Sequence, residues 1–501
     1  MKKMKYSEEN YKNNRNNKKF MAGRSDGFGV RMIALLNAMY CSKKFNLPFA
    51  FVWPTDFTLY NCGESFMKTA KIDENKVLGV YTGKPEEIFS EDFIKKYLLS
   101  EELVKQIEFE NRTGSGLYCL FNYKNIKDFH FNDLLYYESE NPLGWAMPFC
   151  PLFQMFEEDI DAEEFRQVVR ECWKEIGLSK EFCEIVERVD EAARKKGKFV
   201  AVHVRSGDIV YRYCSEAFST KALAAELAVE IIVRELPHYN IVLAGDDITS
   251  LERIIEFSLQ VLKEKNIDYH GHSVTLAKDL IENNNYQDVN LVFYDSYILS
   301  KGEKIFTSEY SAFSRFASLI SSSNEVFSCY EYFSKEEQFE IIKRYIERLY
   351  LHPAQQSFSY LHLMLLARLL KKPMPERIEY ANKMVSLSNL IYAKANYAFF
   401  LIWCGQFDLF YQFTNSLSLD EIAKLVKASL FLYGYRFPEV VIKRFFIGIV
   451  TTEKVRKARF FAKILKSLSK QERIQLNRFG LKLRLKLFYH DLLNKRLHSK
   501  G

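Results

Sequence analysis

The sequence predicts an α/β fold built on a parallel sheet, followed by a helical region. Short apolar runs alternate with long helical patterns between residues 198 and 330, and only helical patterns follow from about residue 334. Strands that alternate with helices are typical of parallel sheets, whose ligands bind beyond the carboxyl ends of the strands. The chain has 501 residues, of which 48% are hydrophobic, so it can form several domains with buried cores.

The N-terminal region has less regular patterns. Residues 1–20 are polar and basic, so we expect a disordered tail and not a secretory signal. The stretch GRSDGFGVRM, residues 23–32, precedes a helical pattern, and FAFVW at 49–53 predicts a strand. The glycines do not fit the dinucleotide fingerprint G-x-G-x-x-G, because Met32 stands at the third glycine position and no strand pattern precedes them.

Asp161 is expected to be a helix N-cap. Glu164 follows three residues later, ahead of an apolar run, which is the pattern of a capping box. The alternative interpretation is a metal-binding D-x-D motif formed with Asp159.

In the α/β region, the sequence predicts four strands separated by helices. The strands are expected at KFVAVHV (198–204), NIVLAG (240–245), KIFTS (304–308) and EVFSC (325–329). The helices are expected at 215–236, 250–265, 287–300 and 311–320.

Helical patterns follow one another in the helical region, for example at 358–372 and 393–413. The second combines small, aromatic and apolar residues with a glycine at its centre, which is typical of tetratricopeptide-like hairpins. No convincing repeat of about 34 residues is visible in the sequence, however.

Positive charge is concentrated at one end of the chain. Residues 441–501 carry 17 Lys and Arg against three Asp and Glu, a net charge of +14, whereas the whole chain carries +7. Basic residues alternate with Leu and Phe there, so this amphipathic tail suits an anionic membrane surface; the alternative is a solvated face packed on its own domain. The nine cysteines form no C-x-x-C pair, which favours a reducing cytoplasm and argues against a zinc site.

Polar side chains gather where the predicted strands end. Arg205 follows the first strand in HVRSGD, and its planar guanidinium suits a phosphate; the alternative is a structural ion pair. Asp246 and Asp247 close the next strand. Hydroxyl side chains continue from the end of the third strand into the next helix, at Thr307, Ser308, Ser311 and Ser314. The backbone N–H groups at the start of a helix favour a bound anion.

In their order along the chain, these motifs resemble those of the GT-B fucosyltransferase superfamily. The resemblance covers roughly residues 21–330. This family includes α1,6- and α1,2-fucosyltransferases and protein O-fucosyltransferases. The resemblance implies two Rossmann-like domains facing a cleft, with the arginine of H-x-R-x-G-D on the β-phosphate of a GDP-sugar. It implies donor-binding residues at Gly27, Gly29, Arg31, His203, Asp208, Asp246, Asp247, Ser311, Phe313 and Ser314. Ser206 departs from the family pattern, because many members have a second arginine there.

The resemblance implies an inverting transfer that needs no metal or other cofactor. Arg205 would then stabilise the leaving diphosphate as the main catalytic cation. Two candidates for the catalytic base stay open: Glu216, in the context SEAF, and Asp26, in the glycine segment. Helix capping and turn formation are the structural alternatives for these two carboxylates.

We therefore expect a cytoplasmic glycosyltransferase at the inner face of the membrane, moving fucose or a related deoxy sugar to a cell-surface glycan. Its partners would be the nucleotide-sugar, a glycan or lipid-linked glycan and an anionic membrane, without nucleic acid. The alternatives are another nucleotide-activated donor, or a non-catalytic helical-repeat binding protein. The expected domains are a tail (1–20), an acceptor-side domain (21–190), a donor domain (191–333), a tetratricopeptide-like helical domain (334–440) and a basic tail (441–501).

Overall fold

A computed structural model describes residues 19–23, 27–53, 83–99, 130–132, 144–148, 150–212, 219–282, 286–308, 311–323, 326–418, 420–422, 424–425 and 428. The described residues form two compact units. One lies within 1–205 and 229–332, and the other within 206–228 and 333–501.

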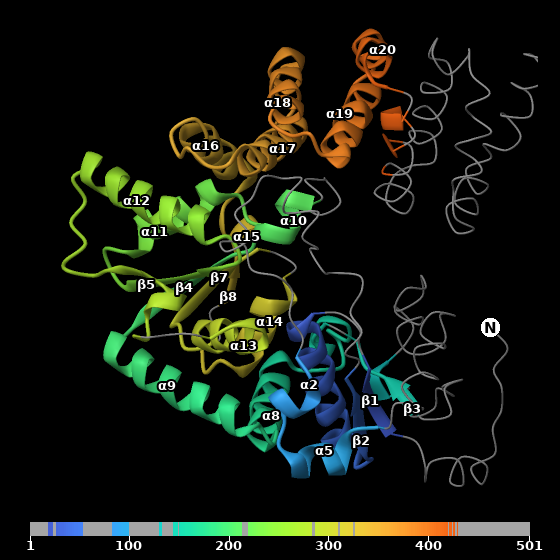
Figure 1. Cartoon of the computed structure of the whole chain (residues 1–501), viewed down its shortest axis with the longest axis vertical. Helices are drawn as coiled ribbons and strands as arrows, with labels where there is room; N and C mark the ends of the chain where they lie inside the picture. Colours follow the sequence, from blue (N-terminus) through green and yellow to red (C-terminus); the bar gives the residue numbers. More distant parts are fainter. Residues whose placement is uncertain are drawn as a thin grey trace, which may run out of the picture. The chain divides into compact units, whose positions relative to one another are not determined.

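The first unit contains a five-stranded parallel sheet with the strand order β6-β5-β4-β7-β8. Helices cover both faces, with α12 on one side and α13 on the other (Figure 1). All six residues of β4 are buried, as expected of a central strand in a parallel sheet. The strands are β4 (Phe199–Val204), β5 (Asn240–Gly245), β6 (Val274–Leu276), β7 (Lys304–Thr307) and β8 (Val326–Ser328).

The four strands predicted for this region are confirmed to within one or two residues, and β6 was not predicted. The main helices of the region are α8 (Ala162–Glu175), α9 (Lys180–Lys196), α12 (Ile248–Glu264), α13 (Asp288–Leu299) and α14 (Ala312–Ile320). Two short elements, η5 (Ala277–Asp279) and α15 (Cys329–Tyr332), complete it.

The helix expected over 215–236 is wrong in its first half. Helix α11 covers only Ala225–Glu235, and residues 219–224 form turns and coil. A short helix that was not predicted, α10 (Gly207–Arg212), follows β4 directly.

A second, three-stranded parallel sheet corrects two further expectations. Its central strand is β1 (Lys19–Gly23), so the chain does form a strand before the glycine segment, and residues 19 and 20 are not part of a tail. Strand β1 pairs with a strand on each side, and its residue Phe20 is fully buried. These contacts with distant parts of the chain stabilise a five-residue strand whose sequence has no clear strand pattern. The flanking strands are β2 (Phe49–Val52), as predicted, and β3 (Gly144–Ala146).

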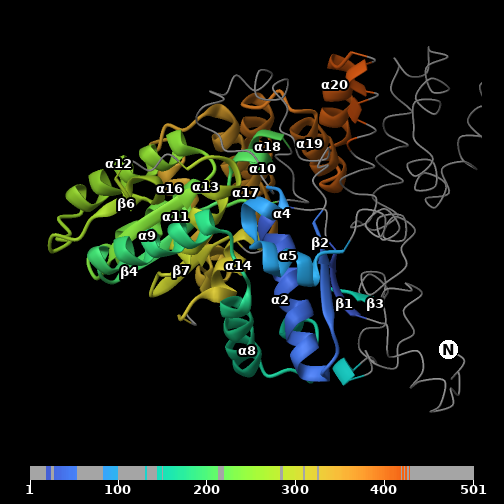
Figure 2. The same ribbon diagram turned by 60° about the horizontal axis from the view of Figure 1, so that its bottom comes forward.

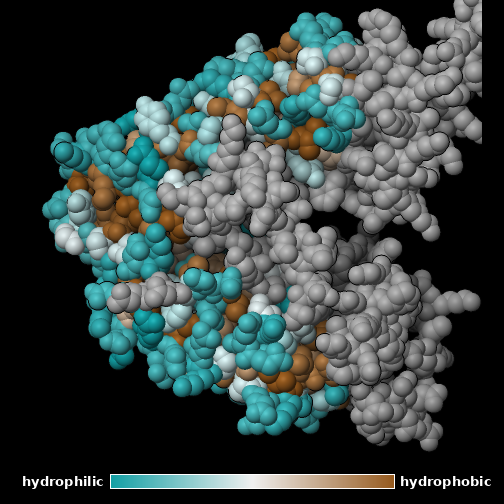
Figure 3. Space-filling model, in the orientation of Figure 1, coloured by the Kyte–Doolittle hydropathy of each residue, from teal (hydrophilic) through white to brown (hydrophobic). Residues whose placement is uncertain are grey.

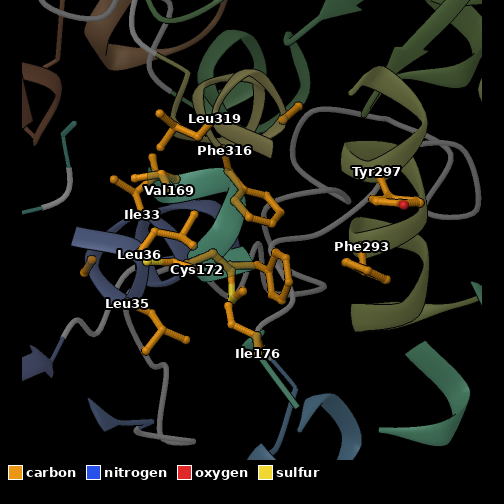
Figure 4. Packing of buried hydrophobic residues seen from close by; sticks show 14 of the residues in the cluster. Ile33, Leu35, Leu36, Val169, Cys172, Ile176, Phe293, Tyr297, Phe316 and Leu319 are labelled. Atoms are coloured by element: carbon orange, nitrogen blue, oxygen red, sulfur yellow. The ribbon is translucent and has the colours of Figure 1, made fainter. Parts of the chain in front are cut away.

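Helix α2 (Phe28–Phe45) packs on this sheet (Figure 2) and connects it to the rest of the unit. One cluster of buried side chains reaches both sheets. Figure 4 shows its centre, with Ile33 and Leu36 from α2, Val169 from α8, Phe293 from α13 and Phe316 from α14. The shorter elements beside it are α4 (Pro85–Ile88), α5 (Glu91–Tyr97) and η3 (Leu152–Gln154).

Asp161 is the N-cap of α8, as predicted: its Oδ1 accepts hydrogen bonds from the backbone N–H groups of Glu163 and Glu164, at 3.0 and 2.8 Å. Asp159 contacts His130 Nδ1 at 2.9 Å and accepts a hydrogen bond from the N–H of Phe131 at 2.7 Å. Both carboxylates of the D-x-D stretch therefore have structural partners.

The second unit is helical over its described residues. Its helices are α10, the start of α11, α16 (Lys335–Tyr345), α17 (Pro353–Leu369), α18 (Met374–Ser386), α19 (Ile391–Trp403) and α20 (Phe407–Ser416). From α16 to α20, each helix packs on the next, as in a helical-repeat array.

The structure reveals a repeat that the sequence did not show. The turns after α17 and α19 both contain a residue with positive φ, Lys371 at 53° and Gly405 at 72°, which are 34 positions apart. The hydrogen bonds of the two turns correspond: Lys372 N donates to Ala367 O at 2.9 Å, and Gln406 N to Leu401 O at 2.8 Å. This spacing equals the period of a tetratricopeptide repeat, and α17–α18 and α19–α20 are two successive helical hairpins with corresponding turns.

Hydrophilic side chains cover most of the described surface on the face drawn in Figure 3. None of the helices in the described ranges has the length and the apolar character needed to cross a membrane.

Candidate functional site

Arg205 and Asp246 are the first residues beyond two neighbouring strands. Strands β4 and β5 are parallel and pair up to Val204 and Gly245, so the chain leaves both strands at the same level of the sheet edge. The strands approach closely because residue 245 is glycine: a β-carbon there would collide with the carbonyl oxygen of Val204. The register thus places Arg205 and Asp246 directly after paired residues of adjacent strands, at the carboxyl edge where ligands of parallel α/β sheets generally bind.

His203 lies under this edge, in contact with helix α14. Its ring is 4.8 Å from that of Phe313, and the side chain is 5% exposed. Burial, together with the positive charge of Arg205, lowers the pKa of His203 to about 3, so the imidazole is neutral near pH 7. Its Nδ1 has no hydrogen-bond partner among the described residues. His203 therefore supports the strand end as a neutral, packed ring.

The start of α14 forms the next part of the edge. Strand β7 pairs with β4, and Ser311 is the N-cap residue of the helix that follows it. The Ser311 side chain is fully buried, makes no capping bond, and its Oγ has no partner in the described part of the chain. Ser314 is already engaged, because its Oγ shares a hydrogen bond of 2.5 Å with Thr307 Oγ1. Of these two serines, Ser311 is the one whose hydroxyl has no hydrogen-bond partner among the described residues.

The start of a second helix, α2, lies against the start of α14 at Gly29. Gly29 lies in the first turn of α2, after the N-cap Gly27, and a β-carbon there would stand 2.7 Å from the carbonyl oxygen of Ala312. The first turns of α2 and α14 are therefore in backbone contact. Because helix N-termini carry partial positive charge and unpaired N–H groups, two of them side by side favour an anion.

Arg31 points into a buried aromatic environment. Its side chain is 2% exposed, and its guanidinium carbon lies 5.0 Å from the centre of the Trp53 ring. Trp53 also packs edge-on against Phe28, and its Nε1 donates to Gly83 O at 3.2 Å. The described contacts of Arg31 thus stabilise the base of α2.

The two predicted nucleoside-contacting aspartates differ in their surroundings. Asp247 is 2% exposed and is the N-cap of α12: it accepts hydrogen bonds from Ser250 N at 3.1 Å and Ser250 Oγ at 2.6 Å. Asp246 is partly exposed at the strand end. The capping bonds occupy both carboxylate oxygens of Asp247, so Asp246 is the one better placed to meet a nucleoside.

Three predicted site residues fall outside what the structure describes. Asp26 and Glu216, the two candidate bases, lie outside the described residues, as does the side chain of Asp208. The described residues contain no group of three His, Cys, Asp or Glu side chains that could hold a metal ion.

The sequence did not reveal the contact between the starts of α2 and α14. The only local signal is a small residue, Gly29, at a helical position. Its partner at Ala312 is 283 positions away, so no local pattern connects them.

No family model matches the chain, and no curated protein matches its sequence. Among solved structures, it is similar to NodZ alpha-1,6-fucosyltransferase soaked with GDP-fucose, at 15% identity over 60% of this chain and 91% of that chain, with a TM-score of 0.29. It is also similar to POFUT1 in complex with GDP, at 13% identity over 62% and 98%, with a TM-score of 0.33. Fucosyltransferase NodZ from Bradyrhizobium matches at 14% identity over 60% and 92%, with a TM-score of 0.31.

Proposed function

We propose that this protein is an inverting, metal-independent glycosyltransferase that moves fucose or a related deoxy sugar from a GDP-sugar to a cell-surface glycan. One observation carries the proposal: Arg205 leaves β4 at the edge where the first turns of α2 and α14 meet. The contact of His203 with Phe313 supports this placement, because it joins the strand that leads to Arg205 to the start of α14.

The proposed chemistry uses this arrangement to hold a diphosphate without a metal ion. As the bond between the anomeric carbon and the β-phosphate oxygen breaks, negative charge develops on the diphosphate. Arg205, the hydroxyl of Ser311 and the N–H groups of two helix starts would stabilise that charge. The acceptor hydroxyl attacks the anomeric carbon from the opposite face and gives its proton to a carboxylate, for which Asp26 and Glu216 remain the candidates.

The donor is tested by thermal unfolding with GDP, UDP, CMP and their sugars. A ligand that binds the folded state raises the unfolding midpoint as its concentration exceeds Kd. We expect stabilisation by GDP and GDP-fucose alone. Stabilisation by UDP or CMP would indicate another donor on the same fold, and no response to any nucleotide would favour a non-catalytic helical-repeat protein.

We further propose a cytoplasmic location and a peripheral membrane contact through residues 441–501. The net charge of +14 in this tail, with Leu and Phe between the basic residues, supports attraction to anionic lipid. The tail lies outside the described residues, so this proposal rests on its sequence.

A further inference from the structure

The segment that follows Arg205 belongs to the helical unit. The chain leaves the first unit after Arg205, and residues 206–228 group with the helices of 333–501 before the chain returns at Val229. In the proposed function, this segment follows the diphosphate-binding arginine and includes the candidate base Glu216. Its placement should therefore affect turnover, and the contacts that hold it in the helical unit become relevant to the reaction.

A buried hydrogen bond joins His362 of α17 to this segment. His362 Nε2 lies 2.9 Å from the carbonyl oxygen of Ser219, and the side chain is 5% exposed. Since the carbonyl oxygen only accepts, Nε2 carries the hydrogen. Burial lowers the pKa of His362 to about 4, which keeps the ring neutral near pH 7. This imidazole is therefore a fixed donor to the turn at 219.

A second buried bond lies one helical turn away on α17. Ser359 Oγ donates to Glu226 Oε2 at 2.7 Å, and both residues are 1% exposed. Glu226 Oε1 has no partner in the described ranges, so this buried carboxyl group depends on its hydrogen bond from Ser359. Because an unbonded buried carboxylate is costly, loss of the serine hydroxyl would favour release of the segment into water.

The start of α17 contacts the other described part of the segment. The Tyr211 ring lies edge-on to the ring of His352, with centroids 5.2 Å apart, and His352 is the N-cap of α17. Helix α17 thus contacts the segment at three places along its length, while its remaining faces pack on α16 and α18. The first hairpin of the repeat binds a segment of its own chain.

We propose that α17, with Ser359 and His362 as positioning residues, holds Ser219 and Glu226 of this segment in the arrangement that donor turnover requires. This rests on the proposed function, and it makes the helical region an integral part of the enzyme.

A matched pair of variants tests the proposal in the full chain. Ser359→Ala removes the bond to Glu226, whereas Ser357→Ala removes an equally buried bond from the same helix to Met384 O, at 2.8 Å in the neighbouring helix α18. Release of GDP from GDP-fucose, with water as the acceptor, measures turnover. We expect Ser359→Ala to lower kcat at least fivefold with KM within twofold, and Ser357→Ala to keep both within twofold.

Backbone hydrogen exchange provides a readout that needs no activity. Ser359→Ala should speed exchange in peptides from 206–228 at least fivefold, and Ser357→Ala should do so in α18. Glu226→Gln retains an oxygen that accepts from Ser359, so it should exchange like the unsubstituted protein. His362→Ala tests the same segment through a different bond and should act like Ser359→Ala.

Equal effects of Ser359→Ala and Ser357→Ala on kcat, or unchanged exchange at 206–228 in both Ser359→Ala and His362→Ala, would overturn the positioning role. Failure of the proposed function has a different signature: the unsubstituted protein would not be stabilised by GDP and would not release GDP from GDP-fucose.

Discussion

Gly29 of α2 and Ala312 of α14 are in direct backbone contact, close enough that a β-carbon on Gly29 would lie 2.7 Å from the Ala312 carbonyl oxygen. The atoms in the way belong to the backbone of α14 and cannot rotate aside. Glycine at position 29 is therefore a packing requirement at the proposed diphosphate site.

Gly29→Ala is expected to destabilise the protein and weaken GDP binding. The added methyl must push the first turns of α2 and α14 apart, and overpacking of this kind typically costs about 1–3 kcal/mol. Urea unfolding and the GDP-induced thermal shift measure the two effects. Unchanged values for both would show that the helices are not in this contact.

Arg205→Ala is expected to lower turnover at least a hundredfold. Loss of one preorganised group that stabilises transition-state charge typically costs about 3–4 kcal/mol. Arg205→Lys keeps the charge without the planar pair of donors, so its turnover should lie between the two. Near-normal GDP release by Arg205→Ala would remove this residue from the mechanism.

Asp246→Ala and Asp247→Ala should separate nucleotide binding from helix capping. Asp247 caps α12, so its loss should lower the free energy of unfolding by about 0.5–2 kcal/mol. If Asp246 accepts a hydrogen bond from the nucleoside, its loss should weaken GDP binding about tenfold or more. Isothermal titration with GDP and urea unfolding of both variants distinguish the roles, and the reverse pattern would contradict the assignment.

Asp295 is expected to make stability depend on pH. Burial raises its pKa from 3.8 to about 8, and its Oδ1 has no partner among the described residues. The folded protein therefore holds this proton more tightly than the unfolded chain. The resulting stabilisation is complete below about pH 4 and is lost as the pH rises to about 8. Asp295→Asn should flatten this part of the profile of unfolding midpoint against pH, and an unaltered profile would contradict it.

Deletion of residues 441–501 is expected to abolish sedimentation with vesicles that contain anionic lipid. Each basic residue near such a surface contributes about 1 kcal/mol, so binding of the full chain should also fall steeply with salt. Neutral phosphatidylcholine vesicles serve as the control. Equal binding by the full and truncated chains would dispose of the membrane contact.

The helices and strands of the α/β region were largely predictable because their patterns are local. The strand 240–245 was predicted with its observed bounds, since a buried apolar run ended by Gly-Asp is unambiguous. The helix over 215–236 was predicted too long because its first half also has helical propensity. In the structure, Ser219 instead bonds to His362 of a distant helix.

The sequence alone determined which residues stand at the strand ends, among them Arg205, Asp246 and Ser311, because strand length and hydrophobic pattern are properties of adjacent residues. Only the tertiary structure decided that β1 is a strand, that the starts of α2 and α14 touch, and that Tyr211, Ser219 and Glu226 contact α17 or its N-cap. Each of these depends on atoms brought together from distant parts of the chain. Their energies come from burial and backbone contact, which appear only once both partners are folded.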